Sequence, residues 1–158
     1  MKAGKAGFTL IELMVVIVIF AILMGLAVYG MNGATSALRY KQGEDTALGA
    51  LKLARARAIR GETQAMVVFV RHPAARSTYS ILWFDNASRP QRWVPEGSGE
   101  FPRDVEYLGA AADSEVFTFS ADGSAPGAPI GARIHSTSGR GYIQTIQVLA
   151  ATGLVSIQ

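Results

Sequence analysis

The chain has 158 residues, a net charge of +3 from 15 basic and 12 acidic side chains, two histidines and no cysteine. This length suits one domain with a modest core, and the lack of cysteine excludes disulfides, zinc fingers, iron–sulfur clusters and thiol catalysis. With only His72 and His135, and no His-Glu-x-x-His motif, a zinc-hydrolase site is not expected, and we expect no cofactor.

Near the N-terminus a short basic leader precedes a long uncharged segment. Residues 13–38 contain no charged side chain, and residues 13–28 are apolar except for Gly25. A stretch of this length crosses the hydrocarbon core of a bilayer as one helix. Lys2 and Lys5 in the leader should stay on the cytoplasmic side of the membrane. The sequence therefore predicts a domain anchored by a single membrane helix.

A secretory signal peptide or a generic signal anchor is the simplest interpretation of such a segment. Two features argue against a signal peptide: no small-x-small cleavage site follows the apolar residues, and Glu12 lies inside their start. A carboxylate in an apolar helix costs about 2.5–3.5 kcal/mol at the centre of a bilayer, and less near its edge. Glu12 therefore either lies among lipid headgroups or meets a positive partner in an assembly.

The segment Gly-Phe-Thr-Leu-Ile-Glu-Leu at residues 7–13 resembles the class III signal of type IV pilins and type II secretion pseudopilins. The resemblance rests on the basic leader, on Gly7 before Phe8, and on Glu12 at the fifth position from Phe8. It implies that prepilin peptidase cuts after Gly7 and that the Phe8 amine is methylated. It also implies that Glu12 pairs with the Phe8 amine of a neighbouring subunit, and that residues 13–28 are first membrane anchor and then filament core.

One long helix is predicted from residue 8 to residue 60, with Gly61 as its C-terminal stop. Its second half has an apolar face that can pack on a sheet. Many major pilins have a kinking proline near position 29, where this chain has Tyr29. Glycines between residues 25 and 33 weaken the helix, so we expect at most local loosening there and no sharp kink. The apolar face consists of Leu48, Leu51, Ala54 and Ala58.

After Gly61 the spacing of apolar residues changes to the alternation typical of strands. Turns are expected at Asp122-Gly123 and at residues 151–153, and long loops at residues 85–101 and 121–131, which are rich in proline, glycine and serine. The predicted fold class is α+β, a long N-terminal helix on antiparallel sheet. The predicted strands are residues 64–71, 78–84, 105–108, 115–120, 132–135, 142–149 and 154–158.

Three later segments resemble the GspH/FimT branch of the same superfamily: the helical segment Leu48–Arg60, residues 117–124, and residues 151–157. The resemblance implies a non-enzymatic minor pilin or pseudopilin near the filament tip. Its partners would be other pilin subunits, prepilin peptidase, the inner-membrane assembly platform and membrane lipid. The residues do not decide between a type IV pilus and a type II secretion pseudopilus.

The expected organisation follows from the anchor and the resemblance together. The N-terminus would lie in the cytoplasm, the helix in the bacterial inner membrane and the head domain in the periplasm, before the subunit enters the pilus or pseudopilus. The expected parts are a leader (1–7), a membrane and assembly half of the helix (8–30), an amphipathic half (31–61) and a β-rich head domain (62–158).

Motifs for catalysis are weak. The segments Gly-Ser-Gly at residues 97–99 and Gly-Arg-Gly at residues 139–141 lack the strand-to-helix context of a nucleophile elbow or a phosphate loop, so we interpret both as loops. Asp122 and Ser124 supply two oxygen ligands, whereas calcium takes about six to eight. His72 and His135 are best explained as surface or edge residues. We therefore expect no catalytic residue and no metal site.

Nucleic acid is the alternative partner. Residues 39–76 contain eight basic and three acidic side chains. Unpaired basic side chains on one surface would contact phosphates, and some members of the GspH/FimT branch are thought to bind DNA during uptake. A solvated helix face, or arginines facing lipid phosphate, explains the same charges. A DNA-binding minor pilin that acts in natural transformation is thus a second hypothesis. The candidate contacts are Lys52, Arg55, Arg133 and Arg140.

Overall fold

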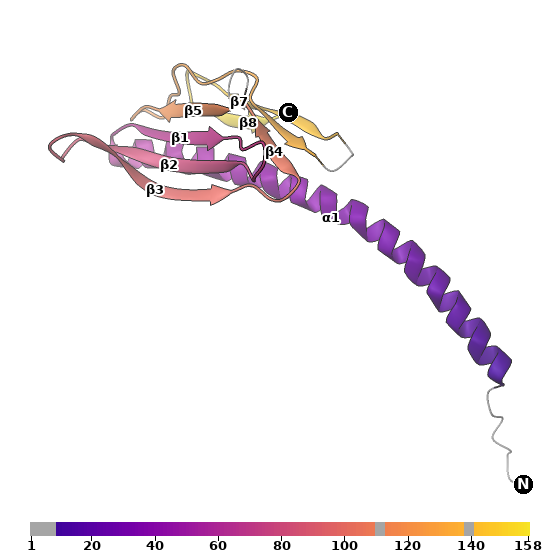
Figure 1. Cartoon of the computed structure of the whole chain (residues 1–158). Helices are drawn as coiled ribbons and strands as arrows, with labels where there is room; N and C mark the ends of the chain where they lie inside the picture. Colours follow the sequence, from indigo (N-terminus) through magenta and orange to yellow (C-terminus); the bar gives the residue numbers. More distant parts are fainter. Residues whose placement is uncertain (1–8, 110–112, 138–140) are drawn as a thin grey trace, which may run out of the picture. The chain divides into compact units, whose positions relative to one another are not determined.

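The computed structural model describes residues 9–109, 113–137 and 141–158, with the backbone alone for residues 28–33 (Figure 1). Gly7, Phe8 and Arg140 lie outside the described residues. The chain forms two compact units, Met1–Ala37 and Leu38–Gln158. Its elements are one long helix and antiparallel strands, which confirms the predicted α+β class.

Helix α1 comprises Leu10–Gly61 and is unbroken through residues 25–33. Its predicted C-terminus was wrong by one residue, because Gly61 is still helical and the left-handed conformation falls on Glu62, with φ 48°. The amide of Thr63 then donates to the carbonyl of Ala58 at 3.2 Å, a bond that closes helices with a left-handed last residue. At the other end the helix begins at Leu10, after Thr9.

The eight strands form two antiparallel sheets. In the first sheet the order is β3-β2-β1-β5, and in the second it is β4-β6-β7-β8. All seven predicted strands are present. The bounds are β1 Ala65–Val70, β2 Thr78–Asp85, β3 Arg92–Glu100, β4 Val105–Leu108, β5 Ser114–Phe119, β6 Arg133–Ser136, β7 Ile143–Val148 and β8 Val155–Ile157.

The core lies between the C-terminal part of α1 and the inner faces of both sheets. Leu51 and Ala54 of α1 are fully buried, as the predicted apolar face requires. Phe69 of the first sheet stacks on Tyr107 of the second, with ring centroids 4.8 Å apart. The hydroxyl of Tyr107 also donates to the buried carboxylate of Glu115 on β5, which ties the two sheets together.

The prediction of a loop over residues 85–101 was wrong, because β3 occupies Arg92–Glu100. The proline and the glycines of β3 are compatible with a strand at the edge of a sheet, where Pro95 needs no ladder donor. Gly99 leaves room for the ring of Tyr79, which would lie 2.7 Å from an added Cβ. The interpretation of residues 97–99 as a loop was also wrong, because these residues lie in β3.

The two expected turns are confirmed. Gly123 has φ 82° and donates to the carbonyl of Ser120 at 2.8 Å. Gly153 has φ 62° and donates to the carbonyl of Leu149 at 2.6 Å. Both glycines adopt the left-handed conformation that other residues enter only at a cost. The predicted loop at residues 121–131 is also present, since it contains neither helix nor strand.

Candidate functional site

The first turn of α1 is closed by Thr9 and Glu12. Glu12 Oε2 accepts hydrogen bonds from the amide and the hydroxyl of Thr9, both at 3.0 Å. The Glu12 amide donates to Thr9 Oγ1 at 3.3 Å, and the Leu13 amide donates to the Thr9 carbonyl. This reciprocal arrangement is a capping box, which satisfies amides that the first helical turn leaves without partners.

The Glu12 carboxylate keeps the capacity to bind a further group. A carboxylate has about four acceptor directions, and Thr9 uses two of them on Oε2. Both Thr9 and Glu12 are exposed. The pair can therefore hold the side chain of Glu12 in one orientation while its outer lone pairs accept from a cation. Thr9 had no role in the sequence interpretation, although the Thr-x-x-Glu spacing at residues 9–12 is a recognisable capping signal.

The helix that follows Glu12 is apolar on every side. Leu10–Ala27 has a mean hydropathy of 2.9 and is long enough to cross a membrane. Every large apolar side chain from Leu10 to Leu26 is between 41% and 76% exposed. A helix with an apolar surface all round is stable when lipid or other helices surround it. Glu12 is the one charged residue in this span.

Most basic residues near the helix are already paired. Arg57 lies 3.0 Å from Glu96 and over the ring of Trp83, with 4.6 Å to the ring centroid. Lys41 forms an ion pair with Glu44 at 2.9 Å. Three further ion pairs are Arg39 with Asp104, Arg71 with Glu106, and Arg76 with Glu100. These contacts reduce the number of cations that are free for phosphate.

Arg55 holds together three segments that are far apart in the sequence. Its Nε lies 3.2 Å from the carbonyl of Gly123 and 3.1 Å from that of Thr152. The segments are the helix, the turn after β5 and the turn before β8, which are the segments that resemble the GspH/FimT branch. The glycines of both turns make this approach possible, since an added Cβ on Gly153 would lie 2.0 Å from the Gly123 carbonyl oxygen. Arg55 thus has a structural role.

Lys52 and Arg133, two of the candidate phosphate contacts, do not join distant segments as Arg55 does. Lys52 on α1 and Arg133 on β6 are exposed, and within the described part of the chain neither forms an ion pair. Arg133 lines a hollow of about 460 Å³ with Leu108, Gly109, Ile130 and Gly131. The two side chains come from different elements, and no described contact joins them.

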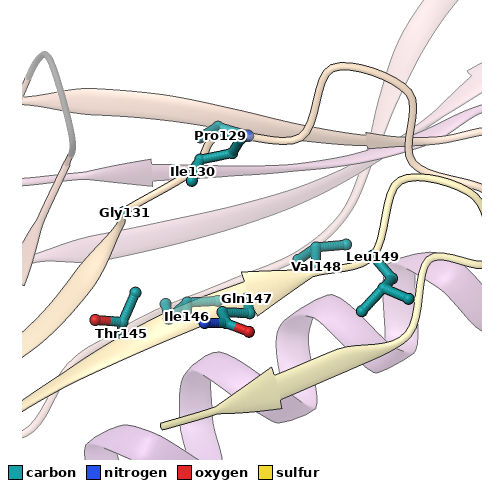
Figure 2. Close-up of a pocket in the computed structure, with 8 residues that line it drawn as sticks. All are labelled: Pro129, Ile130, Gly131, Thr145, Ile146, Gln147, Val148 and Leu149. Carbon is teal, nitrogen blue, oxygen red and sulfur yellow. The ribbon is translucent and has the colours of Figure 1, made fainter.

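The described residues offer no obvious chemical centre. Among them, no group of three or more histidine, aspartate or glutamate side chains could hold a metal ion. The cavity in Figure 2, of about 260 Å³, lies between β7 and the segment before β6 and has no charged group in its walls. Its walls can accommodate an apolar side chain, and they present no acid, base or charged group for catalysis. Its walls are Pro129, Ile130, Gly131, Thr145, Ile146, Gln147, Val148 and Leu149.

Residues 2–28 match the family model described as the prokaryotic N-terminal methylation motif. The matched range contains Gly7, Phe8, the capping box and the whole span Leu10–Ala27. No significant match to a curated protein or to a solved structure was found. The match ends before the head domain, so it bears on the N-terminal segment. The chain carries a type IV pilin-like prepilin signal followed by an apolar helix of membrane length.

Proposed function

We propose that the protein is a non-enzymatic structural subunit, a minor pilin or pseudopilin of a type IV pilus or a type II secretion pseudopilus. Prepilin peptidase cuts the chain between Gly7 and Phe8, and the new Phe8 amine is methylated. The subunit is stored in the inner membrane with its head domain in the periplasm, and the assembly platform moves it into the filament.

The carboxylate of Glu12 near the start of the exposed apolar span Leu10–Ala27 is the observation that supports this proposal most strongly. In a membrane the capping box with Thr9 reduces the cost of this charge, because two donors already satisfy Oε2. In a filament the same carboxylate binds the Phe8 ammonium of a neighbouring subunit. The surrounding apolar side chains then pack against neighbouring helices instead of lipid.

We infer that the chain belongs to the GspH/FimT branch, because the three segments that resemble this branch meet at Arg55. A position near the filament tip is what this resemblance implies. The choice between pilus and pseudopilus depends on which subunits the protein contacts.

The assembly role is tested with Glu12→Ala in the native cell. We expect unchanged membrane insertion, measured by resistance to carbonate extraction, and loss of the subunit from sheared filaments. Asp45→Ala is the matched control, because Asp45 is an exposed acid on the same helix outside the apolar span. If the Glu12→Ala chain entered filaments as well as the wild type, the proposed pairing would be wrong.

A DNA-binding minor pilin is the second candidate function, and Arg133 favours it, because it is exposed and forms no ion pair with any described residue. Neutralising Arg133 and Arg140 together should weaken DNA binding. It should also reduce the slope of log affinity against log salt concentration by the amount expected for about two phosphate contacts. Arg76→Ala is a suitable control because Arg76 is already paired with Glu100. Unchanged affinity of the double variant across a salt titration would remove these two residues from any DNA site.

A further inference from the structure

Strand β7 loses its hydrogen-bonded neighbour on one side before it ends. The amides of Thr145 and Leu149 donate to residues that flank β8, and alternate residues of an antiparallel strand bond to opposite neighbours. Ile146 and Val148 therefore face the other side, towards β6. The Ile146 amide donates to the carbonyl of Ala132 at 2.8 Å, just before β6 begins. Val148 is the last residue of β7 that faces this side.

The register of the sheet assigns Ile130 to Val148, but the two do not pair. Arg133 lies opposite Thr145, and the same register would place Ile130 opposite Val148. No described backbone group bonds to the amide or the carbonyl of Val148, and the Ile130 side chain is 92% exposed. Val148 thus presents one donor and one acceptor side by side. In an antiparallel ladder, a single residue of the next strand exchanges both bonds with such a pair.

The chain beside this gap is too long to pair with β7. Its residues 126–131, which we call the bow, lie between two bonds to the other side of the gap. The amide of Ala125 donates to the carbonyl of Ala150 at 2.9 Å, and the carbonyl of Ala132 accepts from Ile146. Between these bonds the chain takes seven steps on the side of the bow and four on the side of β7. The surplus residues must bend away from the strand, so the gap follows from the length of the bow.

An apolar hollow of about 260 Å³ separates the bow from β7 (Figure 2). An apolar cavity of about 150 Å³ already holds a benzene ring, so this hollow can take one large apolar side chain. Ile146 is fully buried and Val148 packs against the core, and a residue opposite Val148 would place its side chain on this same face. The hollow therefore selects an apolar residue at the position that the register assigns to Ile130.

A cation that pairs with no described acid lies near this position. Arg133 lines the neighbouring hollow of about 460 Å³, which shares Ile130 and Gly131 with the first one. Arg133 is an odd number of residues from Ile130, so in the ladder its side chain belongs to the opposite face. An acid directly after the apolar residue would lie on that face too, two residues or about 7 Å along the strand from Arg133. Charge complementarity therefore favours an acid at this position.

The described part of this chain offers no such segment to a second copy. Outside the helix and the strands it exposes four large apolar side chains, and none of them has an acidic neighbour in the sequence. The partner segment must then come from a different chain. The four side chains are Ile130, Tyr142, Leu149 and Leu154.

We propose that the gap beside Val148 binds an extended segment of a different protein chain, in which a large apolar residue is followed by an acid. The apolar residue exchanges two backbone hydrogen bonds with Val148, antiparallel to β7, and its side chain fills the hollow. The acid meets Arg133. The gap would serve in this way whether or not the chain enters a filament.

Peptide binding to the full chain in lipid nanodiscs tests this proposal. The probe is the fluorescein-labelled peptide Ala-Thr-Ile-Asp-Thr-Ala, and we expect saturable binding by fluorescence anisotropy below about 1 mM. A methyl group on the isoleucine nitrogen of the peptide removes the donor to Val148 and should weaken binding at least about tenfold. Replacing that isoleucine by alanine should do the same, because the hollow is then left unfilled.

Two changes in the chain show whether the peptide uses this gap. Leu149→Asp puts a charge in the wall of the hollow and should weaken binding at least about tenfold. Leu154→Asp is the matched control and should bind as the wild type does, because Leu154 is similarly exposed, at 56% against 53% for Leu149, and does not line the hollow. Arg133→Gln should abolish the preference for the peptide over its Asp-to-Asn form, which we expect to be at least about threefold in the wild type.

Three results would overturn the proposal. The first is no saturable binding of the peptide. The second is equal binding of the N-methylated peptide, which would mean that the hollow takes any apolar group, a lipid chain included. The third is a dimer of the chain that Leu149→Asp abolishes, since this would assign the gap to a second copy.

Discussion

Gly153→Ala should be the most destabilising small substitution in the head domain. Gly153 has φ 62°, which costs an alanine about 1–2 kcal/mol. The added Cβ would lie 2.0 Å from the Gly123 carbonyl oxygen and 3.2 Å from Arg55 Nε, so the two turns must separate. Overpacking of this kind costs about 1–3 kcal/mol, and it weakens the hydrogen bonds from Arg55 to both turns. The conformational cost and the overpacking together amount to about 2–5 kcal/mol.

Gly141→Ala is the matched control, because Gly141 has nearly the same φ of 60° and no described residue lies within 4 Å of an added Cβ. Its cost should be the conformational one alone. At about 4 °C per kcal/mol, thermal unfolding of the full chain in mild detergent should separate the two variants by about 10 °C. Equal melting temperatures would refute the inference that the contact of the two turns at Arg55 holds the helix and the sheets together.

Three further predictions concern the anchor and the core. Thr9→Val should reduce recovery of the chain in membranes, because Glu12 loses one of its two donors, the Thr9 hydroxyl, and keeps only the amide of residue 9, whereas Thr9→Ser should retain recovery. Equal recovery of both variants would argue against the capping role. Burial and the hydrogen bond to Glu115 raise the pKa of Tyr107 above its usual value, so the folded state keeps a proton that the unfolded state loses. The stabilisation from the Tyr107 proton should therefore be fully present below about pH 10 and fall as the pH rises further. In urea titrations Tyr107→Phe should weaken that alkaline fall, and it should lower the free energy of unfolding at neutral pH by about 1–3 kcal/mol. An unaltered alkaline profile would contradict the raised pKa of Tyr107. Gly7→Val should leave the chain uncut, as judged by its mobility on a gel, and a shortened product would exclude cleavage at this position.

Much of the fold could be predicted from local patterns. The helix was predictable because apolar residues keep helical spacing from the anchor to Ala58, and seven strands because their residues alternate. The remaining strand, β3 (Arg92–Glu100), was missed because Pro95 and the glycines of that segment indicate a loop in any local window. Its position at the sheet edge, where such residues are tolerated, is a property of the assembled sheet.

The candidate site shows the same division between local and distant signals. The capping box of Thr9 and Glu12 joins residues three positions apart, so the sequence alone contained it. The bonds of Arg55 join residues 68 and 97 positions apart, and no local pattern distinguishes a structural arginine from a phosphate-binding one. The ion pairs of Arg57 and Arg71 were hidden for the same reason.

Intact mass and N-terminal analysis of the protein from membranes of its native cell would test the central claim most directly. The account predicts a chain that begins at Phe8 and carries one additional methyl group. A chain that still begins at Met1, without methylation, would contradict it. The apolar helix would then be an ordinary signal anchor, and Glu12 would need a different explanation.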